Sequence, residues 1–291
     1  MIYRYLLFLF YILNHPLNKD HKFKTLMKIF WWKVNNIFFH FPIIVQLTPE
    51  IKCICRANNS GYGALVAYNT LPEYGEMMFL LNSLKQNDVF IDVGANIGVF
   101  SLLASSKITN GKIYAFEPSK SILPNLYQNI FLNSKKDTIE VVEKIVSDKV
   151  GTHLFYTHDI PDYNHISNTD KKSGKVLRIL ATSLDRFIAE NKITHIKLIK
   201  IDVEGAEFLV LKGIKKSLAA GLIDALIVEV NKEGMREFGF LPDQIFNYLT
   251  DYGFKLYYFD FNYKLKKLED NLDDVRNIIA VRESQNIRSF E

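Results

Sequence analysis

Between residues 88 and 283, short apolar runs alternate with helical patterns. The first five runs lie at 89–93, 112–116, 139–146, 196–201 and 224–230. Strands that are apolar at nearly every position are buried on both faces, which is typical of a parallel sheet covered by helices. Two further runs, at 254–259 and 275–281, are separated by about fifteen residues without a clear helix and should pair antiparallel at the sheet edge. The pattern predicts a doubly wound α/β fold with a mostly parallel, seven-stranded sheet.

Helix and loop signals fall between these strands. Ser119 is a candidate N-cap for a helix running to about residue 133, and Pro242 suits the first turn of another. Further helices are expected at 99–106, at 183–190 and from the 200s to about Ala219. Residues 151–175 are polar and contain Pro161 and Gly174, so they should form a loop or hairpin insertion.

The chain divides by composition into four parts. These are a basic, aromatic-rich extension (1–49), a connecting strand and helix segment (50–87), the α/β domain (88–283) and a C-terminal tail (284–291). The extension, with six basic residues and one acidic residue, is expected to be helical. It leaves 30 basic and 31 acidic residues for the rest of the chain. A neutral body argues against a nucleic-acid partner, because such a partner needs clustered lysine and arginine.

The extension has two interpretations. Residues 2–13 form an apolar run that is too short to span a bilayer, and residues 22–47 mix lysines with aromatics that include Trp31 and Trp32. Basic residues beside exposed aromatics are typical of a helix that lies on an anionic membrane. The other interpretation is that these aromatics pack on the domain or on a second subunit of a homo-oligomer. The sequence leaves both open.

The two cysteines, Cys53 and Cys55, indicate a reducing compartment. At two residues apart a disulfide between them would be strained, and two thiols alone do not make a zinc site. We therefore expect free thiols and a cytoplasmic protein, with the membrane contact, if present, peripheral.

The loop after the first strand carries the first candidate ligand residues: Asp92, Gly94, Asn96 and Gly98. Gly94 lets the backbone turn close to a ligand, and Gly98 allows tight packing where the next helix begins. The spacing is not the G-x-G-x-x-G of dinucleotide enzymes, and Asp92 would repel a pyrophosphate but suit a cationic cofactor. This disfavours a dinucleotide-dependent oxidoreductase.

The second strand ends in Glu117 and Pro118. A carboxylate at this position can accept hydrogen bonds from both hydroxyls of a ribose, so an adenosine-type ligand is expected. Ser147 and Asp148, directly after the third strand, complete the predicted cofactor site.

The fourth and fifth strands end in further charged groups. Strand alternation directs Lys200 and Asp202 to one side, toward the carboxyl edge of the sheet, and Glu229 ends the fifth strand there. Glu204 is either a site residue or a first-turn helix residue that interacts with the helix dipole. Glu207 is interpreted as a helix-surface or capping residue.

Five segments in order resemble the FkbM-type methyltransferase family. They are residues 91–98 (IDVGANIG), 115–118 (AFEP), 183–185 (SLD), 199–207 (IKIDVEGAE) and 228–229 (VE). The resemblance runs from about residue 87 to residue 282, and IDVEGAE is its most specific element. It implies the class I, Rossmann-like methyltransferase fold, S-adenosylmethionine (SAM) as cofactor, and O-methylation of a hydroxyl on a sugar, glycolipid or other small or secondary-metabolite acceptor.

For this reaction the predicted catalytic residues are Asp202, Glu204, Lys200 and Glu229. A hydroxyl acceptor benefits from a base, and Asp202 is the first candidate, with His153, His158 and His165 of the insertion as further ones. No metal ligand is predicted, although Mg²⁺ bound by these carboxylates is an alternative. An RNA or protein methyltransferase and a non-catalytic interaction module are the remaining alternatives.

Overall fold

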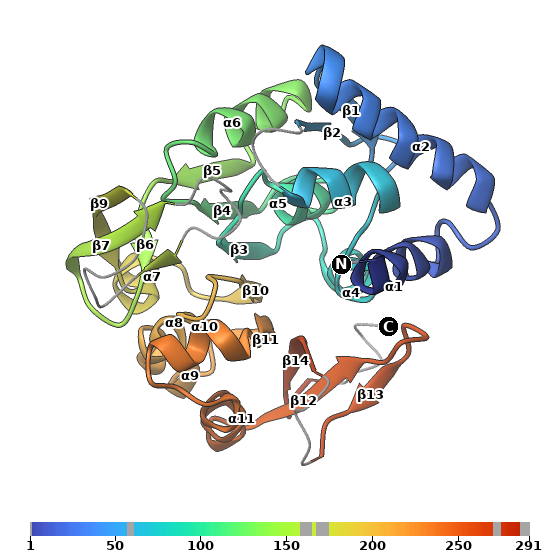
Figure 1. The fold of residues 1–291 in the computed structure, drawn as a ribbon. Helices are drawn as coiled ribbons and strands as arrows, with labels where there is room; N and C mark the ends of the chain where they lie inside the picture. Colours follow the sequence, from blue (N-terminus) through green and yellow to red (C-terminus); the bar gives the residue numbers. More distant parts are fainter. Residues whose placement is uncertain (1, 57–60, 158–164, 167–174, 270–274, 286–291) are drawn as a thin grey trace.

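A central sheet of eight strands organises the protein (Figure 1). The structure is a computed structural model and describes residues 2–56, 61–157, 165–166, 175–269 and 275–285. In spatial order the strands are β13 (Leu265–Lys267), β12 (Phe254–Phe259), β14 (Asn277–Arg282), β11 (Ile223–Glu229), β10 (Ile196–Ile201), β3 (Val89–Val93), β4 (Lys112–Phe116) and β5 (Ile139–Val142).

The five strands β5, β4, β3, β10 and β11 are parallel, as predicted. Val93 pairs in register with Ile201 of β10 and with Phe116 of β4, so these strands end at one edge of the sheet. Parallel strands of open α/β sheets bind ligands beyond this edge. The register therefore brings the residues that follow β3, β4 and β10 together.

The opposite end of the sheet is antiparallel and longer than predicted. β14 pairs antiparallel with both β11 and β12, which confirms the expected edge pairing. The prediction of seven strands was one short, because the segment between β12 and β14 folds back and β13 pairs with Tyr257–Phe259. β13 has only three residues and is mostly exposed, so its apolar signal was too weak to detect.

The predicted third strand, 139–146, splits into two. β5 stays in the main sheet, while β6 (Ile145–Val146) joins a second sheet with β9 (Lys175–Thr182), β7 (Gly151–Thr157) and β8 (His165–Ile166). β7 and β9 pair antiparallel from Gly151 to Thr157, so the predicted insertion is a hairpin that forms its own sheet. Residues 158–164 and 167–174 of the insertion lie outside the described residues.

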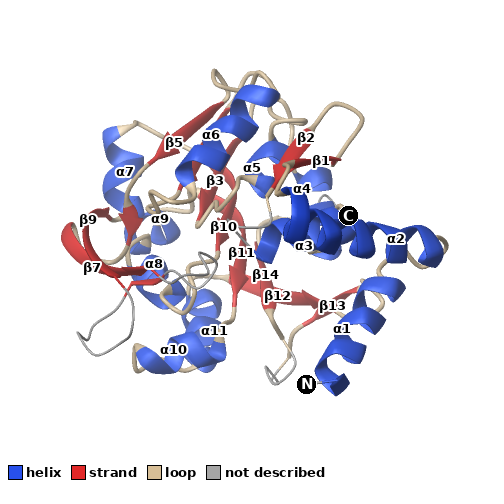
Figure 2. Cartoon of the chain, turned by 45° about the horizontal axis from the view of Figure 1, so that its top comes forward, coloured by secondary structure: helices blue, strands red, loops and turns tan. Residues whose placement is uncertain are grey.

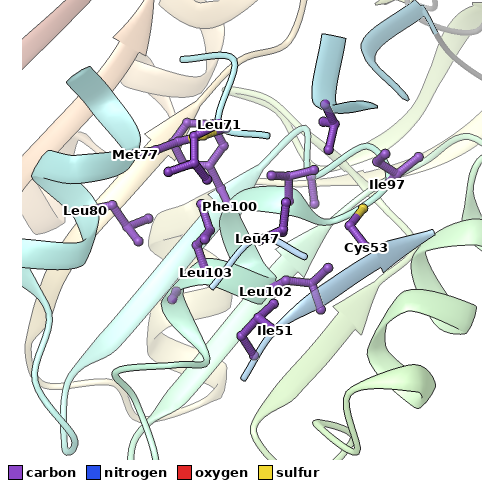
Figure 3. Packing of buried hydrophobic residues seen from close by; sticks show 14 of the residues in the cluster. Leu47, Ile51, Cys53, Leu71, Met77, Leu80, Ile97, Phe100, Leu102 and Leu103 are labelled. Atoms are coloured by element: carbon purple, nitrogen blue, oxygen red, sulfur yellow. The ribbon is translucent and has the colours of Figure 1, made fainter. Parts of the chain in front are cut away.

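Helices cover both faces of the main sheet, as the fold class requires (Figure 1). Phe90 and Ile91 of β3 point to opposite faces and belong to two different core clusters. Figure 3 shows part of the first cluster, which includes Met77, Phe100 and Cys53. The covering helices are α3 (Gly61–Asn69), α4 (Tyr74–Ser83), α5 (Val99–Ala104) and α6 (Leu123–Leu132) on one face, and α7 (Leu184–Glu190), α8 (Glu207–Lys212), α9 (Lys215–Ala219) and α11 (Pro242–Asp251) on the other.

Two helix starts were predicted from single residues. Pro242 is in the first turn of α11, as expected. Ser119 is not the N-cap of α6, which begins at Leu123 after Ile122. The Ser119 N–H instead donates to the side chain of Glu117, so this residue belongs to the turn that follows β4.

The N-terminal extension is helical and one of its faces packs on the domain. α1 (Ile2–Asn14) and α2 (Lys22–Val34) contact one another, followed by a π-helical turn η1 (Asn35–Phe39) and a hairpin of β1 (Ile43–Gln46) and β2 (Lys52–Cys55) (Figure 2). The amide of Asn18, between the helices, donates to the carbonyl of Tyr68 (3.2 Å) and to Asn69 Oδ1 (2.9 Å). Ile12, Ile29 and Trp32 are buried in the same core cluster as the domain. For the buried face of the extension, the interpretation that it packs on the domain is therefore correct.

Two further expectations concern the extension and its neighbours. Cys53 and Cys55 are free, as predicted, and both are buried. None of the described helices is both long enough and apolar enough to cross a membrane.

Candidate active site

A cavity of about 1490 Å³ lies over the carboxyl ends of the parallel strands. One side is formed by the ends of β3, β4, β10 and β11, and the other by α1 and residues 61–76, 258–263 and 275–277. Most of the predicted site residues line it. They are Asp92, Gly94, Asn96, Glu117, Pro118, Lys200, Asp202, Glu204 and Glu229.

The loop after β3 is held in a shape that only small residues allow. Gly94 has φ +84° and Asn96 has φ +51°, both in the left-handed region. A Cβ at Gly94 would lie 1.8 Å from the carbonyl oxygen of Asp202, so the loop passes directly against the end of β10. The Gly94 N–H donates to the carbonyl of Phe116 (3.0 Å), which ties the loop to β4 as well.

Glu117 at the end of β4 is prepared to accept two more hydrogen bonds. It is 5% exposed, and its Oε2 accepts from the Asn96 N–H (2.9 Å) while its Oε1 accepts from the Ser119 N–H (2.8 Å). A carboxylate has about four acceptor positions, so each oxygen retains one. Burial raises the pKa of Glu117 to about 7, although the two N–H donors lower it. The geometry suits the paired hydroxyls of a ribose.

Asp92 places an unsatisfied oxygen at the cavity. The residue is 1% exposed, and its Oδ2 accepts from the Ser101 hydroxyl (2.6 Å). Its Oδ1 is buried and has no hydrogen-bond partner among the described residues. Burial raises the pKa of Asp92, and nearby Lys200 lowers it. A cationic or hydrogen-bond-donating ligand would compensate this oxygen, which fits the sequence interpretation.

Lys200 is a buried cation surrounded by carboxylates. Its side chain is 5% exposed, its Nζ lies 2.6 Å from Asp202 Oδ2, and it sits 4.5 Å from the centre of the Phe100 ring. Burial acts to lower the pKa of Lys200, but Asp202, Glu73 and Asp92 together raise it well above its usual value. Lys200 therefore stays charged and fixes the position of the Asp202 carboxylate.

Three predicted carboxylates meet at the cavity wall. One oxygen each of Asp202, Glu204 and Glu229 lies within 4.8 Å of the others, which is close enough to hold a metal ion. Glu204 has φ +54° and accepts from the Asn231 amide (2.8 Å), so it is a turn residue and not a first-turn residue of α8. Burial, then the neighbouring Asp202, raises the pKa of Glu229 well above its usual value.

Glu207 is buried, so the interpretation of this residue as a helix-surface residue was wrong. Its Oε1 accepts from the Val203 N–H (3.1 Å) and the Gly205 N–H (2.9 Å), which is a capping role for the turn before α8. Burial raises the pKa of Glu207 to about 7. The residue supports the turn that carries Glu204.

The sequence interpretation missed the cavity residues that come from the connecting segment. Glu73 accepts from the Tyr62 hydroxyl (2.8 Å), and Glu76 accepts from the Asn277 amide (3.0 Å). Burial raises the pKa of Glu73 to about 7, with Lys200 lowering it and Asp202 raising it. A signal was available, because Glu73 and Glu76 are the only charged residues between positions 61 and 83. Isolated charges in an apolar helical segment are typical of buried functional groups.

Some predicted residues are not brought to the cavity. Gly98 begins α5, where a Cβ would lie 2.5 Å from Leu126 Cδ1, so it serves helix packing. Ser147 is buried against Thr182, and Asp148 pairs with Lys212 (3.5 Å), because β6 has left the main sheet by this point. Ile145 and Val146, slightly earlier in the chain, line the cavity instead.

The structure does not support the histidines of the insertion as candidate bases. His153 lies in β7 and is not among the described residues that line the cavity. His158 lies outside the described residues, and His165 is placed only as part of β8.

Comparison with known proteins gives two sequence relatives and one structural neighbour. The chain is 29% identical over 203 residues to methyltransferase sdnD of Sordaria araneosa, which covers 58% of this chain and 77% of sdnD. It is 28% identical over 201 residues to the hexuronic acid methyltransferase AglP of Haloferax volcanii, which covers 65% of this chain and 79% of AglP. A methyltransferase of Streptococcus mutans, solved with S-adenosylhomocysteine, shares 15% identity with a TM-score of 0.43 over 72% of this chain and 97% of its own.

The family model of the methyltransferase FkbM domain matches residues 92–256, which is more than half of the chain. The match begins at Asp92 and contains Glu117, Asp202 and Glu229. The chain belongs to the FkbM family of SAM-dependent methyltransferases.

Proposed function

We propose that this enzyme transfers the methyl group of SAM to a hydroxyl oxygen of a sugar or a similar small acceptor. The observation that carries the proposal is the Asp202 carboxylate, whose side chain is 28% exposed, at the cavity between the carboxyl edge of the sheet and α1. The relative AglP supports transfer to oxygen, because the hydroxyls and the carboxylate of a hexuronic acid all offer oxygen atoms as methyl acceptors.

The residues at the end of the sheet fit the cofactor. Glu117 would hold the ribose hydroxyls, the loop of Gly94 and Asn96 would allow close approach, and the unsatisfied Asp92 oxygen suits a positively charged ligand. When bound, SAM supplies an electrophilic methyl group on a sulfonium. The protein must then position an acceptor oxygen and remove its proton.

Asp202 is the proposed base. The acceptor hydroxyl loses its proton to the Asp202 carboxylate as the carbon–oxygen bond forms and the carbon–sulfur bond breaks. Lys200 holds Asp202 through the 2.6 Å contact and would keep the second carboxylate oxygen oriented toward the acceptor. Glu73 and Glu204 also line the cavity and can accept hydrogen bonds from other acceptor hydroxyls.

The charge of the cavity disfavours the RNA alternative. Among its described lining residues, eight are acidic and three are basic: Glu73, Glu76, Asp92, Glu117, Asp202, Glu204, Glu229 and Asp260 against Lys144, Lys200 and Arg276. An acidic wall repels phosphates, whereas hydroxyl-rich acceptors bind well to carboxylates.

The direct test is methyl transfer by the full-length protein from isotope-labelled SAM. We expect labelled product with sugars or glycosides that offer free hydroxyls, and NMR of the product should place the new methyl group on a hydroxyl oxygen. RNA and peptide substrates serve as controls. Transfer to a nitrogen, or to RNA in preference to every sugar tested, would contradict the proposal.

A chelator tests whether Asp202, Glu204 and Glu229 act in proton transfer or bind a metal ion. We expect EDTA to leave the rate unchanged, because Lys200 already pairs with Asp202 and Asn231 with Glu204. The measurement is the initial rate with and without EDTA, followed by added Mg²⁺ or Mn²⁺. A loss that is reversed by either cation would instead assign Asp202, Glu204 and Glu229 to a metal site.

A further inference from the structure

The helix α2 has two apolar faces, and only one of them packs on the domain. Thr25, Ile29 and Trp32 are buried, and the Trp32 ring lies edge-on to Tyr68 at 6.1 Å between centroids. This face holds the extension to α3. It accounts for three of the thirteen residues of α2.

The opposite face of α2 is apolar and exposed. Phe23, Leu26, Met27, Phe30 and Trp31 recur at helical spacing, and Phe30 and Trp31 are 57% and 62% exposed. Large apolar side chains scattered singly are ordinary on a protein surface, but a contiguous group of this size marks an interaction site.

The aromatic surface continues beyond α2. Phe38 and Phe39 of η1 and the following Phe41 are all more than half exposed. The rings of Phe39 and Phe41 stack on one another at 6.1 Å, so they cover each other and not the domain. We call the exposed apolar residues of α2 and η1, together with Phe41, the aromatic surface.

Lysines border the aromatic surface on both sides. Lys24 lies seven residues before Trp31, and Lys33 lies seven residues after Leu26, so the helical period places one lysine at each border of the exposed face. Lys22 and Lys28 add to this charge, and there is no acidic residue between Asp20 and Glu50. An apolar face flanked by lysines matches an anionic lipid surface, whereas a face that binds a second protein is usually depleted of lysine.

We propose that the aromatic surface docks on an anionic membrane and thereby presents a lipid-linked hydroxyl acceptor to the cavity. The extension rests on the bilayer with Phe30 and Trp31 at the headgroup boundary and the lysines on anionic lipid. No crossing of the membrane is involved.

The cavity extends to the extension. Leu7, Phe8, Phe10 and Tyr11 of α1 line the same cavity as Asp202, and α1 contacts α2 (Figure 2). An acceptor whose lipid remains in the bilayer would therefore meet apolar side chains of α1 before its hydroxyl reaches Asp202. This assignment of the acceptor rests on the proposed function, whereas the membrane docking does not.

The test is co-sedimentation of full-length protein with vesicles of phosphatidylcholine alone or with phosphatidylglycerol. We expect binding to the anionic vesicles at about 0.05 M NaCl and strong weakening at about 0.5 M. The variant Phe30→Ser/Trp31→Ser should lower partitioning about tenfold or more. Lys24→Glu/Lys33→Glu should lower it at least about 25-fold, because each lost lysine costs roughly fivefold near an anionic surface and the new carboxylates add repulsion.

Matched controls lie away from the extension. Leu180→Ser in β9 removes an equally exposed apolar side chain, and Lys149→Glu reverses an exposed lysine; both should bind vesicles like the wild type. All four variants should keep wild-type SAM affinity and methylation of a soluble acceptor, so a failure of the proposed function can be distinguished from a failure of membrane docking.

The proposal is overturned if wild-type protein does not bind anionic vesicles, or if it binds neutral vesicles equally well at every salt concentration. A lipid-free dimer that Phe30→Ser/Trp31→Ser makes monomeric also overturns it and assigns the surface to self-association.

Discussion

Replacing Asp202 by asparagine is expected to lower the turnover number by about 10²–10⁴-fold and to change the Kd of SAM by no more than a few-fold. Loss of a general base costs this much when no other group takes the proton. Asparagine keeps the size of the side chain and can still contact Lys200, so the buried lysine retains a polar partner. The measurement is kcat with saturating SAM together with calorimetric Kd.

Two further variants make the result specific. Asp148→Asn is the same chemical change outside the cavity, where Asp148 pairs with Lys212, and should leave kcat unchanged. Glu204→Gln tests the neighbouring carboxylate, the second candidate base. Wild-type rates from both Asp202→Asn and Glu204→Gln would rule out this mechanism and move the role to Glu73, whose pKa of about 7 suits proton transfer.

Replacing Glu117 by alanine is expected to raise the Kd of SAM by about 10- to 150-fold. This corresponds to the ~1.5–3 kcal/mol typical of hydrogen bonds to a charged group. The Asn96 and Ser119 N–H groups would lose their acceptor as well, so the loop after β3 would be less fixed. Calorimetry on a variant with a wild-type circular dichroism spectrum is the measurement, and unchanged affinity would show that Glu117 does not hold the ribose.

The same residue predicts how affinity depends on pH. Burial raises the pKa of Glu117 to about 7, and the ionised form is the one with free acceptor positions. SAM binding should therefore release a proton below pH 7, and the Kd should rise about tenfold from pH 8 to pH 6. Glu117→Gln should abolish this dependence. Glu73→Gln removes a second carboxyl with a pKa of about 7 and should preserve it.

The sequence predicted most of the residues at the sheet edge of the cavity. The buried runs of β3, β4, β10 and β11 fix which residues stand at the carboxyl edge, so Asp92, Glu117 and Asp202 follow from strand position alone. Ser147 and Asp148 followed the same rule and still missed the cavity. The rule assumes that a strand stays in its sheet, and β6 pairs with β9 instead.

The other half of the cavity was not predictable by that reasoning. Glu73 and Glu76 reach it through packing of α4 against the sheet, a contact between distant parts of the chain that no local pattern encodes. The extension shows the same limit. The aromatic content of α2 is visible in the sequence, but the division into a buried face with Trp32 and an exposed face with Trp31 depends on where α3 lies.

The make-up of the cavity wall bears on how acceptor preference could diverge among relatives. The match to the family covers residues 92–256, so α1, Glu73 and residues 258–263 and 275–277 contribute to the wall from outside the match. The hydrogen bonds around Glu117 and the backbone contact between Gly94 and Asp202 lie within the matched residues. Positions 92 and 256 lie inside β3 and β12, so exchange of individual wall residues of α1 or of 258–263, and not of whole flanking segments, is the natural route to a methyltransferase with a new acceptor.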